Sequence, residues 1–289
     1  MGDRFDTITF LSDYGTGDEF VGVVKSVIRS IAPRVTVLDL THEIPPYDVR
    51  AGSLTLGRAA QYLCPGVVLA VVDPGVGTPR RGIAVEVGGG QSYLVGPDNG
   101  LLASAVAMSG GATAAVELTN AAYQLAAPGP TFAGRDVFAP AAAHLCAGVP
   151  LDDLGPGLDP LSLLPGLIPL ARDEEGATVA EVLWVDRYGN CQLNVDPDDI
   201  DGLGARVQLR WHDDVRTAER AVTYQGIAPG QVGLVVDSYG MLSVCLGRRS
   251  ASAELRMPVG TEVTLTAPTD HDGPASAPVS ITPRSTRKP

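Results

Sequence analysis

Three polar segments follow apolar, strand-like runs in the first half of the chain. They are residues 12–15 (Ser-Asp-Tyr-Gly), 73–77 (Asp-Pro-Gly-Val-Gly) and 96–100 (Gly-Pro-Asp-Asn-Gly). Ligands of open α/β sheets bind beyond the carboxyl ends of the strands, so polar residues there are candidates for a site. A single aspartate at a strand end is just as often a turn or helix cap. Three such ends in one sheet favour a binding site.

Asp73 is the strongest candidate for chemistry. It directly follows the apolar run 67–72 (VVLAVV) and precedes a glycine-rich turn, and Arg80 and Arg81 come seven and eight residues later. We therefore expect Asp73 to face a pocket, with an arginine folded back towards it.

The second half of the chain carries two similar polar turns, residues 186–190 (DRYGN) and 237–242 (DSYGML). Each places a carboxylate and a tyrosine on a tight turn. Ordinary hairpin chemistry accounts for both turns by itself, so their use as a ligand-binding surface needs independent support.

The elements that must position these residues alternate in the first half. Strand-like runs at 7–11, 34–40, 67–72, 83–87 and 93–95 are interleaved with helix-like segments at 19–31, 49–63, 100–108 and 137–147. This alternation predicts an α/β domain with a mostly parallel central sheet.

The pattern breaks around residues 151–176. A segment rich in Asp, Gly and Pro is followed by short strand-like runs at 180–185, 192–195, 206–209, 232–236, 242–244 and 262–265. These runs predict an all-β, barrel-like module. The predicted organisation is an α/β domain at 1–165, a linker at 166–176, a β-barrel domain at 177–267 and a disordered tail at 268–289.

Composition excludes several classes of function. The net charge is −12 and only two residues are Lys, so there is no basic stripe for nucleic acid. No apolar stretch is long enough to span a membrane, and the polar N-terminus does not resemble a signal peptide. The four Cys are far apart and favour reduced core thiols. We expect a cytoplasmic protein.

Known cofactor and metal motifs are also missing from the sequence. The 75–77 Gly-Val-Gly turn lacks the spacing of dinucleotide- or NTP-binding loops. The four His are scattered, with no metal-ligand spacing, and no GxSxG motif suggests a serine hydrolase. The sequence therefore predicts neither a metal nor a cofactor.

Seven motifs occur in one order, and together they resemble the S-adenosylmethionine (SAM) hydroxide adenosyltransferases, or SAM hydrolases, which are relatives of the fluorinases and chlorinases. They are residues 10–15 (FLSDYG), 41–49 (THEIPPYDV), 71–81 (VVDPGVGTPRR), 95–102 (VGPDNGLL), 131–140 (TFAGRDVFAP), 186–190 (DRYGN) and 237–242 (DSYGML). The resemblance spans about residues 7–265. It implies an α/β domain, a β-barrel domain and a homotrimer that holds SAM at its subunit interfaces.

The resemblance also assigns residues. Asp13 matches the ribose-binding aspartate, whose carboxylate can accept two hydroxyl protons, and Tyr47 matches the aromatic residue near ribose and adenine. In the second domain, Asp186, Tyr188, Asn190 and Ser238 match positions that hold adenine and the methionine amino and carboxylate groups. The complete set of implied substrate-binding residues is Asp13, Tyr47, Asn99, Phe132, Gly134, Asp186, Tyr188, Asn190, Ser238, Ser243, Leu246 and Arg248.

Asp73, Arg80 and position 133 match the catalytic residues. The related halogenases carry Tyr where this chain has Asp73, so the resemblance implies attack by water or hydroxide on the ribose C5′ of SAM. The products would be adenosine and L-methionine, and SAM would be a substrate, with no cofactor. The family has also been linked to the (R)-sulfonium epimer of SAM.

Position 133 departs from the family pattern, because Ala133 stands where the family has a catalytic His. Losing one positioned acid–base group costs roughly 10²–10⁴-fold, so we expect impaired turnover. A substitution that preserves bound SAM and a slow natural enzyme both fit Ala133. The alternatives to a hydrolase are a SAM- or adenosine-binding protein without turnover and a chlorinase-type halogenase.

Overall fold

The computed structural model describes residues 4–166 and 168–268. The chain forms two compact units that divide between Ile168 and Pro169, and each is described by itself. Residues 172–174, inside the segment predicted as a linker, form a short strand. The predicted disordered tail falls outside the described residues from position 269 onward.

The first unit contains a seven-stranded sheet in the order β2-β1-β3-β5-β4-β6-β7. Its strands are β1 (Thr7–Ser12), β2 (Thr36–Thr41), β3 (Val67–Val71), β4 (Gly82–Val87), β5 (Ser92–Pro97), β6 (Ala112–Glu117) and β7 (Gly157–Leu158). The neighbours β2, β1, β3 and β5 run parallel, whereas β4, β6 and β7 add antiparallel pairs. The predicted α/β class with a mostly parallel central region is confirmed, in a sheet that is mixed overall.

Apolar content explains why β1 and β3 are interior strands of the sheet. All five residues of β3 are buried, as are five of the six residues of β1. A strand that is covered on both faces reads as a continuous apolar run. Asp13 and Asp73 come just beyond the carboxyl ends of these two strands, where the backbone leaves the sheet.

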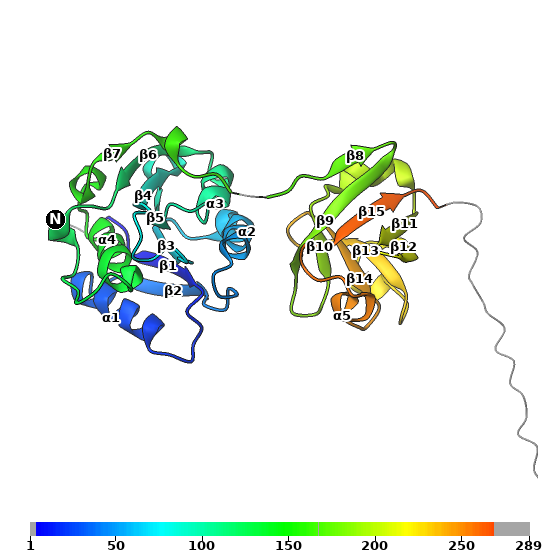
Figure 1. Cartoon of the computed structure of the whole chain (residues 1–289), viewed down its shortest axis with the longest axis horizontal. Coiled ribbons are helices and arrows are strands. Elements are labelled where there is room, and N and C mark those ends of the chain that lie inside the picture. Colours follow the sequence, from blue (N-terminus) through cyan, green and yellow to red (C-terminus); the bar gives the residue numbers. More distant parts are fainter. Residues whose placement is uncertain (1–3, 167, 269–289) are drawn as a thin grey trace, which may run out of the picture. The chain divides into compact units, whose positions relative to one another are not determined.

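Helices cover both faces of this sheet, as Figure 1 shows. Helix α1 (Phe20–Ile31) packs with α4 (Ala139–Cys146) against β1 and β3 on one face, and α2 (Val49–Ala59) packs with α3 (Ala103–Met108) on the other. A Cβ added at Gly52 or Gly57 of α2 would lie within 3 Å of Leu101 or Ser104, so these glycines let the chain around α3 approach closely. The core of the unit lies between the sheet and these helices.

One helical segment differs from the prediction for 137–147. The chain begins to coil earlier, as a π-helical turn, η4 (Gly134–Phe138), which leads directly into α4. Pro140 lies in the first turn of α4, where its missing N–H costs no hydrogen bond. Single π-helical turns often occur at functional sites, and η4 follows directly on Ala133.

The second unit is a closed β-barrel. Its strands are β8 (Arg172–Glu174), β9 (Ala177–Val185), β10 (Cys191–Leu193), β11 (Arg206–Trp211), β12 (Asp214–Ala221), β13 (Val232–Val236), β14 (Leu242–Leu246) and β15 (Glu262–Thr266). The order β10-β14-β13-β12-β11-β15-β9 closes through pairing of β9 with β10, and β8 extends β9 at the margin. The predicted barrel-like module is confirmed.

Besides β8, strand β12 and helix α5 of the second unit escape sequence patterning. Strand β12 contains only one buried residue, Ala218, so its apolar signal is weak, but it pairs with β11 along its length. Helix α5 (Ala251–Leu255) is a single short turn capped by Ser250.

The remaining helical pieces are short 3₁₀ turns: η1 (Ala60–Tyr62), η2 (Gly88–Gly90), η3 (Ala121–Tyr123), η5 (Leu151–Leu154), η6 (Pro160–Ser162), η7 (Pro197–Leu203) and η8 (Tyr224–Gly226). Within residues 4–166 and 168–268, none of the helices has the length and apolarity required for a membrane span.

Candidate active site

The carboxyl ends of β1, β3 and β5 bring the three polar segments of the first unit to one edge of the sheet. The Asp13 N–H donates to the Val71 carbonyl at 3.3 Å, which joins the ends of β1 and β3. The Asn99 Nδ2 donates to the Val72 carbonyl at 2.9 Å, which joins β3 to the segment after β5. Parallel neighbours in the sheet therefore produce the clustering that the sequence predicts.

Asp73 and Arg80 form a bidentate ion pair. The Arg80 Nε donates to Asp73 Oδ1 at 2.8 Å, and its Nη2 donates to Oδ2. The Asp73 side chain is 6% exposed and that of Arg80 is 18% exposed. The guanidinium also lies over the Phe138 ring, 5.2 Å from its centroid. A paired, largely buried carboxylate is held in one orientation, as a group that positions water must be.

The neighbouring residues Arg81 and Asp98 are part of the framework. Arg81 pairs with Asp98 through two guanidinium nitrogens and donates to the Ser162 carbonyl at 2.7 Å. The Asn99 Oδ1 accepts from the Leu101 N–H at 3.1 Å. Asn99, an expected substrate-binding residue, thus connects backbone segments and is not among the residues that line the pocket described next.

A pocket of about 630 Å³ opens at this edge of the sheet. Its size falls in the range of small-molecule sites. Of the expected site residues, Asp13, Tyr47, Asp73, Phe132, Ala133 and Gly134 line it. Lining residues that were not assigned to the site from the sequence are Tyr14, Glu19, Phe20, Val23, Pro46, Val76, Pro128, Gly129, Thr131 and Arg135.

Asp13 and Tyr47 are coupled across the pocket rim. The Asp13 Oδ2 accepts a hydrogen bond from the Tyr47 N–H at 2.9 Å. Tyr47 has a left-handed backbone conformation (φ 69°), which is uncommon for a residue with a side chain. Its side chain is 74% exposed. The carboxylate thus fixes a strained turn and keeps its other oxygen for a ligand.

Tyr14 was overlooked by sequence reasoning, although it lies between Asp13 and Gly15 of the first motif. Its ring contacts those of Phe20 and Phe132, each with a centroid separation of 5.7 Å. Burial raises the pKa of the Tyr14 phenol above its usual range, and the carboxylates of Asp13 and Asp73 add to the rise. The phenol is therefore neutral at ordinary pH. Its position directly after Asp13 was the available signal.

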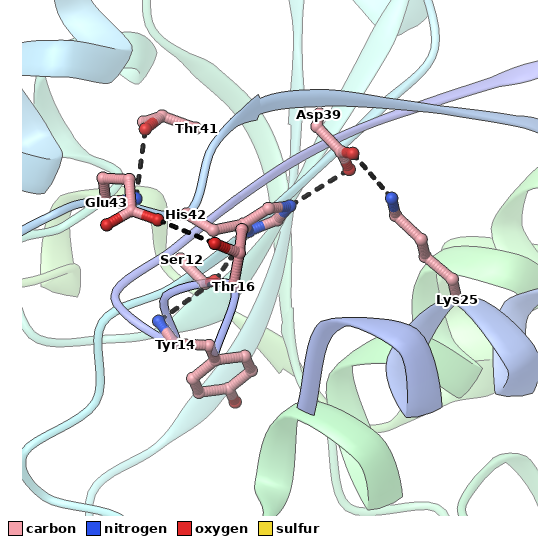
Figure 2. Close-up of polar contacts among 8 residues, drawn as sticks. All are labelled: Ser12, Tyr14, Thr16, Lys25, Asp39, Thr41, His42 and Glu43. Atoms are coloured by element: carbon pink, nitrogen blue, oxygen red, sulfur yellow. Dashed lines mark hydrogen bonds and ion pairs between the residues drawn. The ribbon is translucent and has the colours of Figure 1, made fainter. Parts of the chain in front are cut away.

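A polar network that is buried at Ser12 and His42 and exposed at Asp39 supports the turn that carries Asp13 and Tyr14 (Figure 2). The Ser12 Oγ lies 2.8 Å from His42 Nδ1 and accepts from the Tyr14 N–H at 3.3 Å. The His42 Nε2 lies 3.0 Å from Asp39 Oδ1, and Asp39 also accepts from Lys25 at 2.6 Å. Ser12 is fully buried and His42 is 5% exposed.

The hydrogen bonds of this network change the pKa of Asp39. Burial by itself would raise the pKa of Asp39, but hydrogen bonds from Lys25 and His42 outweigh it and lower the pKa. Although Ser, His and Asp lie in series, the buried Ser12 is not among the residues that line the pocket. The arrangement therefore stabilises the turn after β1.

A second pocket, of about 770 Å³, lies in the barrel unit. Six of the seven residues expected there line it: Asp186, Tyr188, Asn190, Ser238, Leu246 and Arg248. The seventh, Ser243, is 2% exposed and donates to Asp237 at 3.3 Å, so it lies beneath the surface. Tyr224, Cys245, Arg249 and Ser250 also line the pocket and were not identified from the sequence.

The two polar turns of the barrel unit have the same construction. The Asp186 Oδ1 accepts from the Tyr188 and Asn190 N–H groups, both at 2.8 Å. The Asp237 Oδ1 accepts from the Tyr239 and Met241 N–H groups in the same way, at 2.9 and 3.2 Å. In both turns the aspartate folds the loop, and in the first turn Tyr188, 79% exposed, remains available to a ligand.

The described part of the chain contains no group of three or more His, Cys, Asp or Glu side chains placed to hold a metal ion. The polar groups that line the first pocket include the Asp13 and Asp73 carboxylates, the Arg135 guanidinium and the Tyr14 phenol. These groups can position water and a polar organic molecule.

Comparisons with known proteins assign both units to the same family. Residues 8–155 match the family domain described as the SAM hydroxide adenosyltransferase N-terminal domain, and residues 180–264 match the corresponding C-terminal domain. The structure also resembles that of an uncharacterized conserved protein from Thermotoga maritima, with a TM-score of 0.83 and 34% identity. That match covers 90% of this chain and 99% of the other.

Curated relatives include hydrolases and halogenating enzymes. A protein named (R)-S-adenosyl-L-methionine hydrolase from Salinispora tropica is 43% identical over 260 residues, covering 90% of this chain and 97% of the relative. One of the same name from Thermus thermophilus is 39% identical, covering 89% of this chain and 98% of the relative. A protein named fluorinase from Actinoplanes sp. is 29% identical, covering 90% and 97%.

Proposed function

This chain belongs to the SAM hydroxide adenosyltransferase family, and on that premise we propose that it hydrolyses SAM to adenosine and L-methionine. The observation that carries the proposal is Asp73, which lines the first pocket and is held there by a bidentate ion pair with Arg80, a residue that does not itself line the pocket. The relatives named (R)-SAM hydrolase align over about nine-tenths of the chain, which supports the (R)-sulfonium epimer as a substrate.

The reaction is an in-line displacement at the ribose C5′. The oxygen of water forms a bond to C5′ while the C5′–S bond breaks, and the electron pair of that bond leaves on sulfur. Sulfur becomes a neutral thioether, so the leaving group needs no acid. Asp73 orients the attacking water and accepts its proton, and Arg80 holds the Asp73 carboxylate and stabilises negative charge on the oxygen.

Substrate binding is divided between the two pockets in this proposal. Asp13 accepts hydrogen bonds from the ribose hydroxyls, and Tyr47 contacts the nucleoside beside it. The barrel pocket, with Asp186, Tyr188 and Asn190, holds adenine and the methionine group. We propose a homotrimer in which the first pocket of one subunit is completed by the barrel pocket of the next, acting in the cytoplasm without a cofactor.

Ala133 places a methyl group in the first pocket, where it can neither orient water nor take a proton. We therefore propose slow turnover for this chain. The change Ala133→His would add an imidazole to the same pocket, with an expected gain in kcat of roughly 10²-fold or more.

The test is chromatography of adenosine and methionine after incubation with each sulfonium epimer of SAM. The wild-type chain is compared with Ala133→His and with Asp73→Asn, which retains the size of the side chain but removes its charge. Adenosine from the wild type, more from Ala133→His and almost none from Asp73→Asn is the expected result. Retained SAM without adenosine from any variant would identify a binding protein, and chloride-dependent 5′-chloroadenosine would identify a halogenase.

A further inference from the structure

The first pocket contains a hydroxyl group that the proposed mechanism has not used. Tyr14 lines the same cavity as Asp73 and Ala133. A Cβ added at Gly134 would lie 2.1 Å from the Tyr14 Oη, so the phenol oxygen rests directly against the backbone of the residue after Ala133. The hydroxyl therefore lies against the residue that follows Ala133, in the pocket to which Ala133 contributes only a methyl group.

The Tyr14 ring is held firmly from several sides. Phe20 and Phe132 contact it at 5.7 Å and each other at 5.2 Å, and Phe10 approaches at 6.5 Å from the core. Its backbone N–H is bonded to the buried Ser12, and Figure 2 shows the ring pointing away from the Ser12–His42 contact. A ring fixed in this way delivers its hydroxyl to one place, which is the requirement for positioning a reacting atom.

The hydroxyl is free to bind a ligand. No group within residues 4–166 and 168–268 forms a hydrogen bond with the Tyr14 Oη, although the Asp13 and Asp73 carboxylates both act on it electrostatically. Burial and these charges raise its pKa, so it remains a neutral phenol. A neutral phenol can accept a hydrogen bond from water and donate one of its own.

We propose that Tyr14 is a catalytic residue whose hydroxyl, together with the Asp73 carboxylate, holds the attacking water in line with C5′. This inference rests on the proposed SAM hydrolysis. One O–H of the water donates to the Tyr14 Oη and the other to Asp73. As the new C5′–O bond forms and the C5′–S bond breaks, the second proton passes to Asp73 and then to solvent, and Tyr14 keeps its own proton.

The test is the kinetics of adenosine release by the wild type and by Tyr14→Phe. The variant retains the ring and its aromatic contacts but lacks the hydroxyl. We expect kcat to fall about 10- to 100-fold with KM changed less than about threefold, because a misplaced reacting atom costs up to about 10²-fold. The matched control is Tyr93→Phe. It removes a phenol hydroxyl that donates to Glu86 at 3.2 Å, outside the pocket. This variant should leave kcat unchanged.

A second comparison, in the Ala133→His background, separates an effect on the position of the attacking water from an effect on folding. In the Ala133→His background, an imidazole can hold the same water, so Tyr14→Phe should cost less than about threefold in kcat. An equal loss in both backgrounds, or a rise in KM with unchanged kcat, would contradict the role of Tyr14. If the wild type and Tyr14→Phe release adenosine equally fast, this inference fails and the hydrolase proposal survives. If the wild type releases none, both fail.

Discussion

Asp73 engages Arg80 through both carboxylate oxygens, and its side chain is only 6% exposed. Removing one partner of a buried pair leaves the other charge uncompensated, which typically costs 3–5 kcal/mol. Substitution of Arg80 should therefore affect folding as well as catalysis. Asp73→Asn leaves one hydrogen-bond acceptor for Arg80 but also removes the carboxylate charge, so its folding should be measured beside its kinetics.

Tyr14 predicts a dependence of stability on alkaline pH. Its pKa in the folded protein is raised by burial and by the Asp13, Asp73 and Asp136 carboxylates, and Arg80 opposes the rise. The unfolded chain releases this proton above about pH 10, whereas the folded protein keeps it. The unfolded state then binds fewer protons, so the free energy of unfolding falls as pH increases, by at most about 1.4 kcal/mol per pH unit for this group.

Urea denaturation at pH 9 and pH 11 measures this effect. The loss of stability between the two values should be smaller in Tyr14→Phe than in the wild type, since Phe does not ionise. Other buried groups, including Cys245 with its pKa raised by burial to about 11, contribute equally to both proteins and cancel in the comparison. Identical losses in the two proteins would mean that the Tyr14 phenol ionises normally.

At the scale of elements, the π-helical turn η4 and the turn after β1 fit together through Gly134. The absence of a Cβ at this position accommodates the Tyr14 hydroxyl, because a Cβ would lie 2.1 Å from Oη and 3.1 Å from Cζ. So short a contact cannot be relieved without moving a ring that three other aromatic residues contact.

Gly134→Ala should therefore destabilise the protein by about 1–3 kcal/mol. In the Tyr14→Phe background the cost should be smaller, since the 2.1 Å contact is removed and the nearest atom is then Cζ. Chemical denaturation of the two single variants and the double variant gives the coupling energy. Gly129→Ala is the matched control: Gly129 lines the same pocket, a Cβ there meets nothing within 4 Å, and the change should be close to neutral. If the losses of unfolding free energy in Gly134→Ala and Tyr14→Phe simply add up in the double variant, Gly134 and the Tyr14 hydroxyl are not in contact.

At the scale of the whole molecule, the proposed trimer makes a distinctive prediction about mixed subunits. Asp73→Asn damages the first pocket, and Tyr188→Ala removes an exposed aromatic side chain from the barrel pocket. Losing one aromatic stacking contact with a base costs about 1–3 kcal/mol, so each variant alone should be severely impaired. In the proposed trimer each active site combines pockets from two subunits, so co-expressed variants should form some sites in which both pockets are intact.

The measurement is adenosine release by the separate and the co-expressed variants, together with the mass of the assembly in solution. Recovery of activity well above the sum of the separate variants is the expected result. Activity equal to that sum, from a protein of trimeric mass, would place both pockets of a site in the same subunit. A monomeric mass would exclude the trimer itself.

The spacing of apolar residues along the sequence was sufficient to predict the fold class of both units. The buried runs of β1 and β3 and the amphipathic α1 are local patterns, and strand-to-helix alternation is enough to predict parallel neighbours. The candidate residues Asp13 and Asp73 followed from the same reasoning, since strand ends are visible in sequence. Strand β12 was not predicted, because its single buried residue leaves no alternating pattern.

Contacts between distant segments required the tertiary structure. Sequence order alone does not bring Tyr14 beside Gly134, 120 positions away, nor Ser12 beside His42. It also does not distinguish Asp73, which lines the pocket, from Asp98, which is committed to Arg81 and the Leu164 backbone. The physical reason is that periodicity reports which face of an element is buried, whereas a site is made by side chains from several elements, and only packing decides which of them meet.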